Sequence, residues 1–287
     1  MAFPLISVLM TAYNREKYIA EAIESVLAST FKDFELIIVD DCSKDRTVEI
    51  ARRYLADPRV QLHVNEKNLG DYHNRNRAAS LARGKHLKYL DSDDVIYPHG
   101  LAVMVAAMEQ YPDAALALER PPSSKEPYPL LVTPRQAYIE QFLEAGFLDV
   151  GPTATIVCAS SFHAAGDFSG KRCVGDSEMW LKLAARWPVV KLPQGLIWWR
   201  QHDQQEIIVE RVNVMVAADR YLVYVNALNA PECPLNAEQR RQALSWIKRR
   251  HARDLLRLAV RNTKPLAALK MMRATGFGFA DLARAFS

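Results

Sequence analysis

Two short apolar runs indicate the fold class: LISVLM at residues 5–10 and LIIV at residues 36–39. Each is followed directly by a polar residue. Both runs are too short for a helix and are typical of buried strands. Between them, apolar residues recur at helical spacing over 18–27. A strand, a helix and a second strand in this order predict a parallel pair joined by a right-handed crossover.

The same alternation continues through the first hundred residues, with helices expected over 47–55 and 75–83 and strands over 60–64 and 87–90. This succession predicts an α/β fold in which a mainly parallel sheet is flanked by helices. Ligands of such sheets bind beyond the carboxyl ends of the strands. We therefore expect three polar segments to meet at one rim: Thr11–Asn14, Asp40–Asp41 and Asp91–Asp94.

Beyond residue 100 the alternation is lost, and helices dominate the end of the chain. We expect helices over 101–110, near 179–184, over 206–228 and over 237–262, strands over 114–118, 153–158 and 189–199, and a Pro-rich loop over 120–133. We therefore expect a sheet domain at 1–204, with halves 1–100 and 101–204, and a helical C-terminal extension at 205–287.

The composition excludes several classes of protein. With 49% hydrophobic and 24% charged residues, the chain of 287 residues is expected to fold around a large core. No run of about 18 apolar residues and no signal-peptide pattern is present, so neither a membrane-spanning helix nor secretion is expected. The scattered cysteines favour a reducing, cytoplasmic setting; they are Cys42, Cys158, Cys173 and Cys233.

Positive charge is concentrated at the C-terminal end. Residues 240–287 hold twelve Lys and Arg and two acidic residues, a net +10, which leaves 25 − 31 = −6 for residues 1–239. In the last long helix, one face carries Leu244, Ile247, Leu255 and Leu258, and a neighbouring face carries Arg250, Arg253, Arg257 and Arg261. Our hypothesis is a reversible, peripheral contact with the anionic inner face of a membrane. The alternative is that the apolar face packs on the rest of the chain or in a homo-oligomer, and the arginines keep the helix solvated.

Three carboxylates crowd the end of one predicted strand, in Asp91-Ser92-Asp93-Asp94. Like charges this close repel, and a hard divalent cation such as Mg²⁺ or Mn²⁺ neutralises them while binding phosphate oxygens. An ordinary acidic turn or helix cap is the alternative. The chain has no Walker loop, Gly-x-Ser-x-Gly motif or zinc-type His pair. We therefore expect a metal ion and arginine side chains to bind phosphate. We expect no nucleic-acid partner.

Several motifs follow one another along the first hundred residues: ISVLMTAYN at 6–14, AIESVL at 22–27, FELIIVDDCS at 34–43, NLG at 68–70, RN at 75–76, ARG at 82–84 and LDSDD at 90–94. Further along stand GDF at 166–168, GDSEMWLKL at 175–183 and WRQH at 199–202. In this order they resemble the family 2 inverting glycosyltransferases of the GT-A fold. The resemblance implies an enzyme that moves a sugar from a nucleotide-diphosphate sugar, with a UDP-sugar favoured, to a hydroxyl of a glycan or lipid-linked acceptor. It also implies Mn²⁺ or Mg²⁺ as cofactor.

Position by position, the resemblance gives each candidate residue a role. On the nucleotide side, Thr11, Tyr13 and Asp41 match uracil contacts, Asn14 lies beside them in the motif, and Arg75 matches a basic residue that closes over the nucleotide. Around the diphosphate, Asp93 matches a ribose or diphosphate contact, Asp94 matches the metal ligand with Asp91 sharing that work, and His202 matches a metal or diphosphate contact of some members. Asp176 matches the carboxylate that takes the proton of the acceptor hydroxyl.

Two departures from the family pattern leave alternatives open. The family often has Glu-Asp where this chain has Gly175-Asp176, so either Asp176 or Glu178 is the base. It often has Ala-Arg-Asn at 74–76, where this chain has Asn-Arg-Asn, and this leaves the nucleotide base open. Two rival functions are a sugar nucleotidyltransferase, which is expected to have a Gly-rich basic loop after its first strand, and a catalytically silent scaffold subunit of a glycan-assembly complex.

Overall fold

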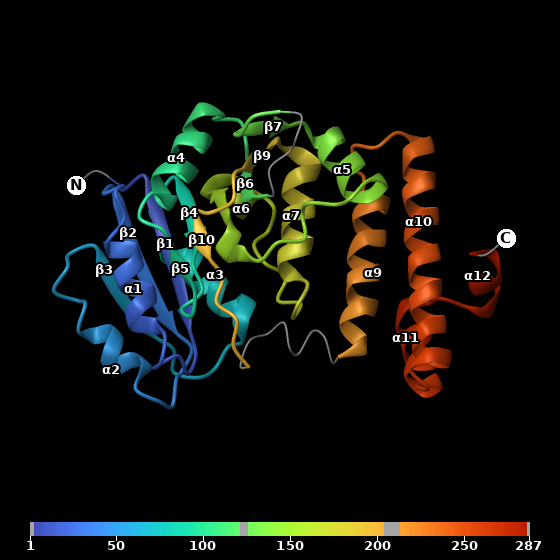
Figure 1. The fold of residues 1–287 in the computed structure, drawn as a ribbon, viewed down its shortest axis with the longest axis horizontal. Helices are drawn as coiled ribbons and strands as arrows, with labels where there is room; N and C mark the ends of the chain where they lie inside the picture. The colour runs from blue at the N-terminus through green and yellow to red at the C-terminus, as the bar shows by residue number, and fades with distance from the viewer. Residues whose placement is uncertain (1–2, 121–125, 204–212, 286–287) are drawn as a thin grey trace.

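The computed structural model describes residues 3–120, 126–203 and 213–285. A twisted sheet with helices on both faces forms one part of the molecule, and a group of C-terminal helices stands beside it (Figure 1). The expected domain boundary at 204/205 and residues 121–125 of the expected Pro-rich loop lie outside the described residues.

The first half of the sheet is parallel, as the alternation of apolar runs predicts. Its strands are β1 (Ile6–Ala12), β2 (Phe34–Asp40), β3 (Val60–Val64) and β4 (His86–Tyr89), which lie in the order β3-β2-β1-β4, and its helices are α1 (Ile19–Leu27), α2 (Thr47–Arg52) and α3 (Asp71–Leu81). Every residue of β2 is buried because helices cover both faces of the sheet.

Within the described residues, strands of both directions extend the sheet to eight, in the order β3-β2-β1-β4-β8-β6-β9-β7. The added elements are α4 (Gly100–Gln110), β6 (Leu116–Glu119), β7 (Leu130–Val132), α5 (Pro134–Leu143), η1 (Pro152–Ala154), β8 (Thr155–Cys158), α6 (Ala159–Ala164), α7 (Gly175–Arg186) and β9 (Val189–Leu192). The mainly parallel sheet flanked by helices that we predicted is therefore confirmed.

Several sequence-based boundaries are wrong. The loop expected over 120–133 contains β7, and the helix expected over 47–55 ends at Arg52. The strand expected over 189–199 breaks after Leu192, because Pro193 has no N–H for the ladder and Gly195 adopts φ 91°; its end forms β10 (Ile197–Trp198), which pairs with β5 (Val95–Ile96). The helix expected over 75–83 begins at Asp71. Its first turn is polar yet packed, and Asn74 Nδ2 donates to Val39 O at 3.0 Å.

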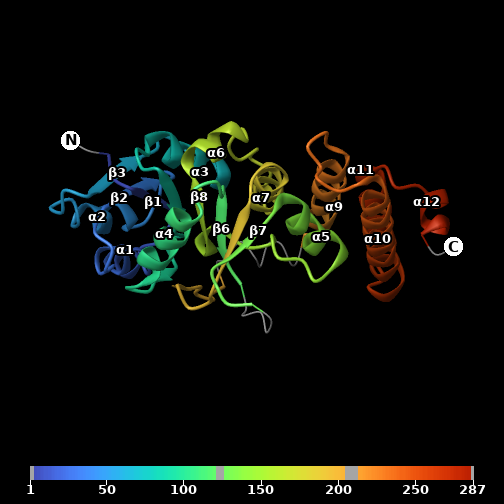
Figure 2. The same ribbon diagram turned by 90° about the horizontal axis from the view of Figure 1, so that it is seen from above.

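Alternating residues of each strand enter two hydrophobic layers, one on each face of the sheet. On one face Val8 and Met10 pack in the same cluster as buried residues of α1 and α4, and on the other Leu9 packs with residues of α3 and α7. Figure 2 shows α1 and α4 on one side of the sheet and α3 and α6 on the other. Because helices cover the two faces of the sheet, the polar loops lie at the ends of the strands.

The C-terminal helices share a core with the sheet domain. They are α9 (Val214–Asn229), α10 (Ala237–Leu256), the π-helical turn η2 (Arg257–Arg261), α11 (Pro265–Thr275) and α12 (Phe279–Arg284). Ile247, Leu255 and Leu258 are buried in the cluster that also holds Leu9 and Trp180, and Leu244 packs against it. The apolar face of α10 therefore packs on the rest of the chain, which is the alternative that we gave for this face. No described helix combines the length and the apolarity needed to cross a membrane.

Candidate active site

A cleft of about 640 Å³ opens at the carboxyl ends of β1, β2 and β4. The predicted residues that line it are Thr11, Tyr13, Asp41, Arg75, Asp91 and Asp93. The rim that we expected from the strand order is therefore present, and it brings together side chains up to 82 residues apart in the sequence (93 − 11 = 82). Asn14, Asp94, Asp176, Glu178 and His202 do not line this cleft, and their positions are described below.

Asp41 forms the inner wall of the cleft and holds the loop that leads into α3. Its Oδ1 accepts hydrogen bonds from Leu69 N at 2.8 Å and Asn65 Nδ2 at 2.7 Å, and its Oδ2 accepts one from Gly70 N at 2.9 Å. Gly70 adopts φ 85°, a conformation that favours glycine. The NLG motif at 68–70 thus wraps around this carboxylate.

Asn14 connects the loops that follow β1 and β2. Its N–H donates to Ser43 Oγ at 2.8 Å and its Oδ1 accepts from Lys44 N at 2.8 Å, with the backbone at φ 53°. Asn14 therefore fixes the loop beside Tyr13, whose side chain is 45% exposed at the mouth of the cleft.

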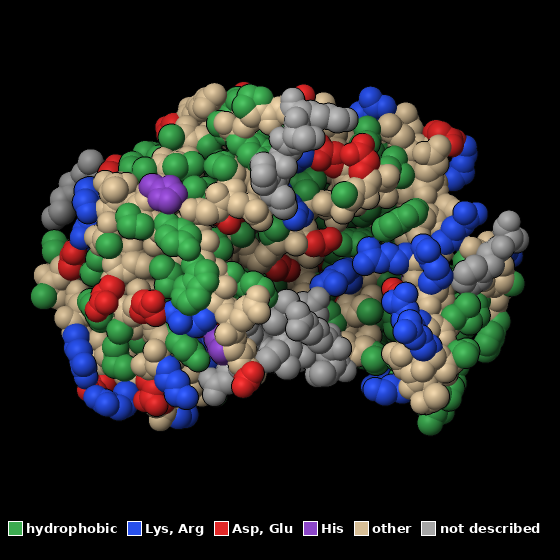
Figure 3. Space-filling view, viewed as in Figure 1, with side chains coloured by type: hydrophobic (Ala, Val, Ile, Leu, Met, Phe, Trp, Pro, Cys, Tyr) green, Lys and Arg blue, Asp and Glu red, His purple; other side chains and the backbone are tan. Residues whose placement is uncertain are grey.

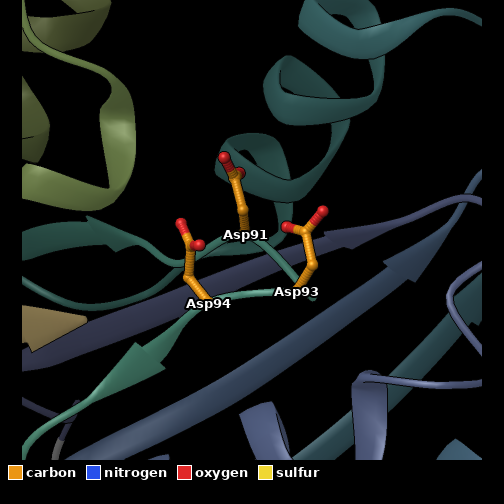
Figure 4. A group of neighbouring side chains, drawn as sticks. All are labelled: Asp91, Asp93 and Asp94. Atoms are coloured by element: carbon orange, nitrogen blue, oxygen red, sulfur yellow. The ribbon is translucent and has the colours of Figure 1, made fainter. Parts of the chain in front are cut away.

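Asp91, Asp93 and Asp94 form a compact acidic cluster after β4. One carboxylate oxygen of each lies within 4.8 Å of the others, and the three side chains extend from one turn in the same general direction (Figure 4). Asp94 Oδ1 accepts from Arg200 N at 3.0 Å, whereas its buried Oδ2 has no hydrogen-bond partner within the described residues. Burial, reinforced by Asp91 and Asp93, raises the pKa of Asp94 to about 7. A set of hard oxygens with an orphaned buried carboxylate oxygen fits a divalent cation.

Asp93 has two basic partners. Its Oδ2 accepts from Arg15 Nε at 3.0 Å and lies 2.8 Å from His202 Nε2. The His202 ring stacks on Tyr18 with centroids 4.7 Å apart. His202 thus lies at the acidic cluster, and its contact with a metal or diphosphate stays a prediction. Arg15 is a cleft residue that the motif analysis missed. Its place directly after TAYN at the strand end was the available signal.

Arg75 is a buried cation at the base of the cleft. Its guanidinium pairs with Asp71 at 2.9 Å and with Asp91 at 2.7 Å, and lies 5.9 Å from the centroid of the Tyr89 ring. Its Nη1 has no hydrogen-bond partner within the described residues. This arrangement connects the acidic cluster directly to the first turn of α3.

Asp176 and Glu178, both in the first turn of α7, have different surroundings. The N–H of Asp176 donates to Tyr72 Oη at 3.1 Å, and the Tyr72 ring lines the cleft. Burial raises the pKa of Asp176 to about 6, although the Ser177 N–H and Arg75 act in the other direction. A carboxyl group that ionises near neutral pH beside a cleft is suited to accept a proton.

Glu178 is held by the loop before α7 and by a lysine. It accepts from Ser169 Oγ and from Lys171 Nζ at 2.7 Å, and it lines a separate cavity of about 340 Å³ between α7 and α9. Burial raises its pKa, but Lys171 and Ser169 outweigh that effect and leave the pKa below its ordinary value. Geometry therefore favours Asp176 over Glu178 as a proton acceptor for a ligand in the cleft.

The sequence model described as "Glycosyl transferase family 2" matches residues 7–163, more than half of the chain, and this span holds the cleft residues from Thr11 to Asp93. The chain belongs to glycosyl transferase family 2. The resemblance that the motifs indicated is thereby confirmed.

Curated relatives of this family-2 chain include proteins of polysaccharide biosynthesis. It is 39% identical over 110 residues to the putative colanic acid biosynthesis glycosyl transferase WcaA of Escherichia coli K12, covering 37% of this chain and 39% of WcaA. It is 38% identical over 110 residues to the putative glycosyltransferase EpsE of Bacillus subtilis 168, covering 38% of this chain and 40% of EpsE. The match spans two-fifths of the length of some of these curated relatives and as little as 13% of others.

Solved structures match the family-2 chain over nearly its whole length. S. aureus TarS 1-349 in complex with UDP-GlcNAc superposes with a TM-score of 0.70 at 21% identity, covering 94% of this chain and 81% of TarS. Mannosyltransferase PcManGT from Pyrobaculum calidifontis, in complex with GDP-Man and Mn²⁺, gives 0.64 at 18% identity, covering 99% and 86%. At these identities the likeness establishes the shared fold.

The structure also explains one departure from the family pattern. A Cβ at Gly175 would lie 2.9 Å from the Tyr72 ring, and Tyr72 is 6% exposed. The ring of Tyr72 therefore fills the space beside position 175, where the family often has glutamate. Sequence reasoning missed Tyr72, because the helix that carries it was predicted to begin at Arg75 and begins at Asp71.

Proposed function

We propose that this family-2 chain is a metal-dependent inverting glycosyltransferase. It moves a sugar from a nucleotide-diphosphate sugar, preferably a UDP-sugar, to an acceptor hydroxyl in surface-polysaccharide or glycan biosynthesis. The observation that carries the proposal is one cleft lined by Asp91 and Asp93 of the three-carboxylate cluster, by the buried Arg75, and by Tyr72, whose hydroxyl accepts a hydrogen bond from the Asp176 N–H. The family membership and the biosynthetic relatives support it.

In this proposal the nucleotide lies between the loops after β1 and β2. Thr11, Tyr13 and Asp41 take the base and ribose side, where Asp41 is already anchored by backbone N–H groups. A UDP-sugar in TarS and a GDP-sugar in PcManGT are precedents for donors of this class in the same fold.

Asp91, Asp93 and Asp94, with His202 beside them, are the residues that would hold Mn²⁺ or Mg²⁺. When bound, the metal neutralises charge on the departing nucleoside diphosphate. Arg75 and Arg15, which pair with Asp91 and Asp93, keep two of these carboxylates in place and add positive charge at the same edge of the cleft.

Asp176 acts as the base. As the acceptor oxygen bonds to the anomeric carbon, its proton passes to the Asp176 carboxylate and the bond from that carbon to the diphosphate oxygen breaks. A single displacement of this kind inverts the anomeric configuration. Tyr72 holds the Asp176 backbone and so orients the start of α7 toward the cleft.

Calorimetric titration with UDP tests the shared metal–nucleotide site. Affinity for UDP should be about 5–150-fold higher with Mn²⁺ than in EDTA, since two ligands that interact in one site raise each other's affinity by the same factor. GDP under the same conditions is the control for nucleotide preference and should bind more weakly. Equal UDP affinity with Mn²⁺ and with EDTA would remove the metal from the proposal.

The pH dependence of donor turnover reports the ionisation of Asp176. Only the carboxylate accepts a proton, so kcat/KM should be constant above about pH 7 and fall about tenfold per unit once the pH drops below the raised pKa of about 6. The residual activity of Asp176→Asn should lose this dependence. If kcat/KM instead began to fall only near pH 4, the base would be a carboxylate with an ordinary pKa.

A further inference from the structure

The surface of the C-terminal extension, described over residues 213–285, carries large hydrophobic side chains that the shared core does not use. Among the described residues, those at least a third exposed are Trp246, Leu256, Val260, Leu266, Leu269 and Phe279. Leu266 is 83% exposed, and Val260 and Phe279 are each 74% exposed. These residues differ from the apolar face of α10, which is buried.

The exposed apolar residues alternate with cations on outward faces. On α11, Leu266, Leu269, Lys270 and Arg273 have the spacing of one helical face, and all four are exposed. The opposite face of the same helix, with Ala268 and Met271, is buried. At the end of α10 and in η2, Arg253, Leu256, Arg257 and Val260 have the same spacing and are also exposed. We call these two sets the docking stripes.

The charge around the docking stripes is mainly positive. Residues 240–287 hold twelve cationic and two acidic side chains, and one of the acids, Asp254, is 3.5 Å from Arg257. A cavity of about 630 Å³ between α10 and α12 adds a cationic wall from Arg240, Arg241, Lys248 and Arg249 over the aliphatic Leu244. Figure 3 shows Lys and Arg gathered over α9 and α10, with hydrophobic side chains reaching the surface at the tip where α10 meets α11.

We propose that the docking stripes bind the surface of an anionic phospholipid bilayer. Apolar side chains that protrude between cations match the interface of a membrane, where they enter the acyl boundary while Lys and Arg meet lipid phosphates. Each cation near such a surface raises the partition constant roughly fivefold, and salt weakens this attraction. The inference goes beyond the proposed reaction and does not depend on it, because it concerns a surface outside the cleft.

Co-sedimentation of the full chain with vesicles tests the inference without any turnover. The vesicles contain equal parts phosphatidylglycerol and phosphatidylcholine, or phosphatidylcholine alone, at low and at high salt. Leu266→Ser/Leu269→Ser removes the apolar half of one docking stripe, and Lys270→Gln/Arg273→Gln removes its cationic half. Arg52→Gln/Leu55→Ser, an exposed pair in the sheet domain, is the matched control. Circular dichroism verifies that each variant is folded.

We expect binding to the anionic vesicles at low salt, loss of binding at high salt, and at least a tenfold loss in each docking-stripe variant, with the control unchanged. Equal binding to both vesicle types, or an equal loss in the control, would overturn the proposal. Sedimentation equilibrium without lipid measures whether the chain forms a dimer through this surface. A wild-type dimer that becomes a monomer in Leu266→Ser/Leu269→Ser would overturn it in favour of a second copy of the chain as occupant of this surface.

Discussion

Replacing Asp176 with asparagine should lower kcat by about 10²–10⁴-fold, the range that a positioned general base contributes. The amide keeps the size of the side chain but has no basic oxygen for the acceptor proton. Because Asp176 does not line the cleft in which we place the nucleotide, UDP affinity measured by calorimetry should remain close to that of the wild type. The loss should therefore be confined to turnover.

Glu178→Gln is the matched variant, two residues further along the same helix. Glu178 contacts Ser169 and Lys171 and faces another cavity, so its amide should keep kcat within a few-fold of the wild type. The reverse result, with Glu178→Gln inactive and Asp176→Asn active, would move the base two residues along α7. Full activity of both variants would make this turn purely structural.

Asp94→Asn should abolish the dependence of UDP binding on Mn²⁺. Its Oδ2 is buried beside two further carboxylates, and an amide there offers the cation no charge. Loss of a residue that only supports a metal ligand lowers metal affinity by about 10–100-fold. Asp94 is a proposed ligand itself, so we expect its replacement to lower metal affinity by at least this much. Calorimetry with Mn²⁺, in the presence and absence of UDP, measures this effect.

The same substitution removes a source of repulsion from the metal-free protein. Asp94 lies against Asp91 and Asp93, so Asp94→Asn should raise the melting temperature without metal while Mn²⁺ no longer raises it further. Asp113→Asn, at an exposed site away from the cleft, is the control and should change neither quantity. Retention of wild-type Mn²⁺ affinity in Asp94→Asn would exclude this carboxylate from the metal site.

The rim of the cleft was predictable from sequence because strand direction fixes where loops go. Once LISVLM, LIIV and residues 87–90 are assigned to parallel strands, Thr11, Asp41 and Asp91 must lie at the same edge of the sheet. The acidic cluster was likewise visible as three carboxylates in four residues. Neither conclusion required knowledge of side-chain packing.

The choice between Asp176 and Glu178 could not be made from sequence. Both belong to the first turn of α7, and the side of the helix that faces the cleft is set by contacts with α3, above all by the Tyr72 ring beside Gly175. Those contacts join residues more than a hundred positions apart. Arg15 was missed for a related reason, since its partner Asp93 is 78 residues away.

For the C-terminal helices too, the sequence did not show which residues pack against one another. The spacing of Leu244, Ile247, Leu255 and Leu258 identified an apolar face correctly, but periodicity does not say what covers that face. In the structure the shared core covers it, and His251 in the same row stacks on Tyr221 of α9 at 4.1 Å. The exposed residues of α11 carried no comparable signal because they alternate with cations.

Donor turnover by the purified chain is the most direct test of the central claim. The protein is incubated with a panel of UDP- and GDP-sugars in Mn²⁺, without acceptor, and release of the nucleoside diphosphate is measured. We predict slow release from at least one UDP-sugar, its loss in EDTA, and no release of pyrophosphate from nucleoside triphosphates with sugar phosphates. Release of pyrophosphate, or intact donors across the whole panel while UDP still binds, would contradict the assignment of this cleft to glycosyl transfer.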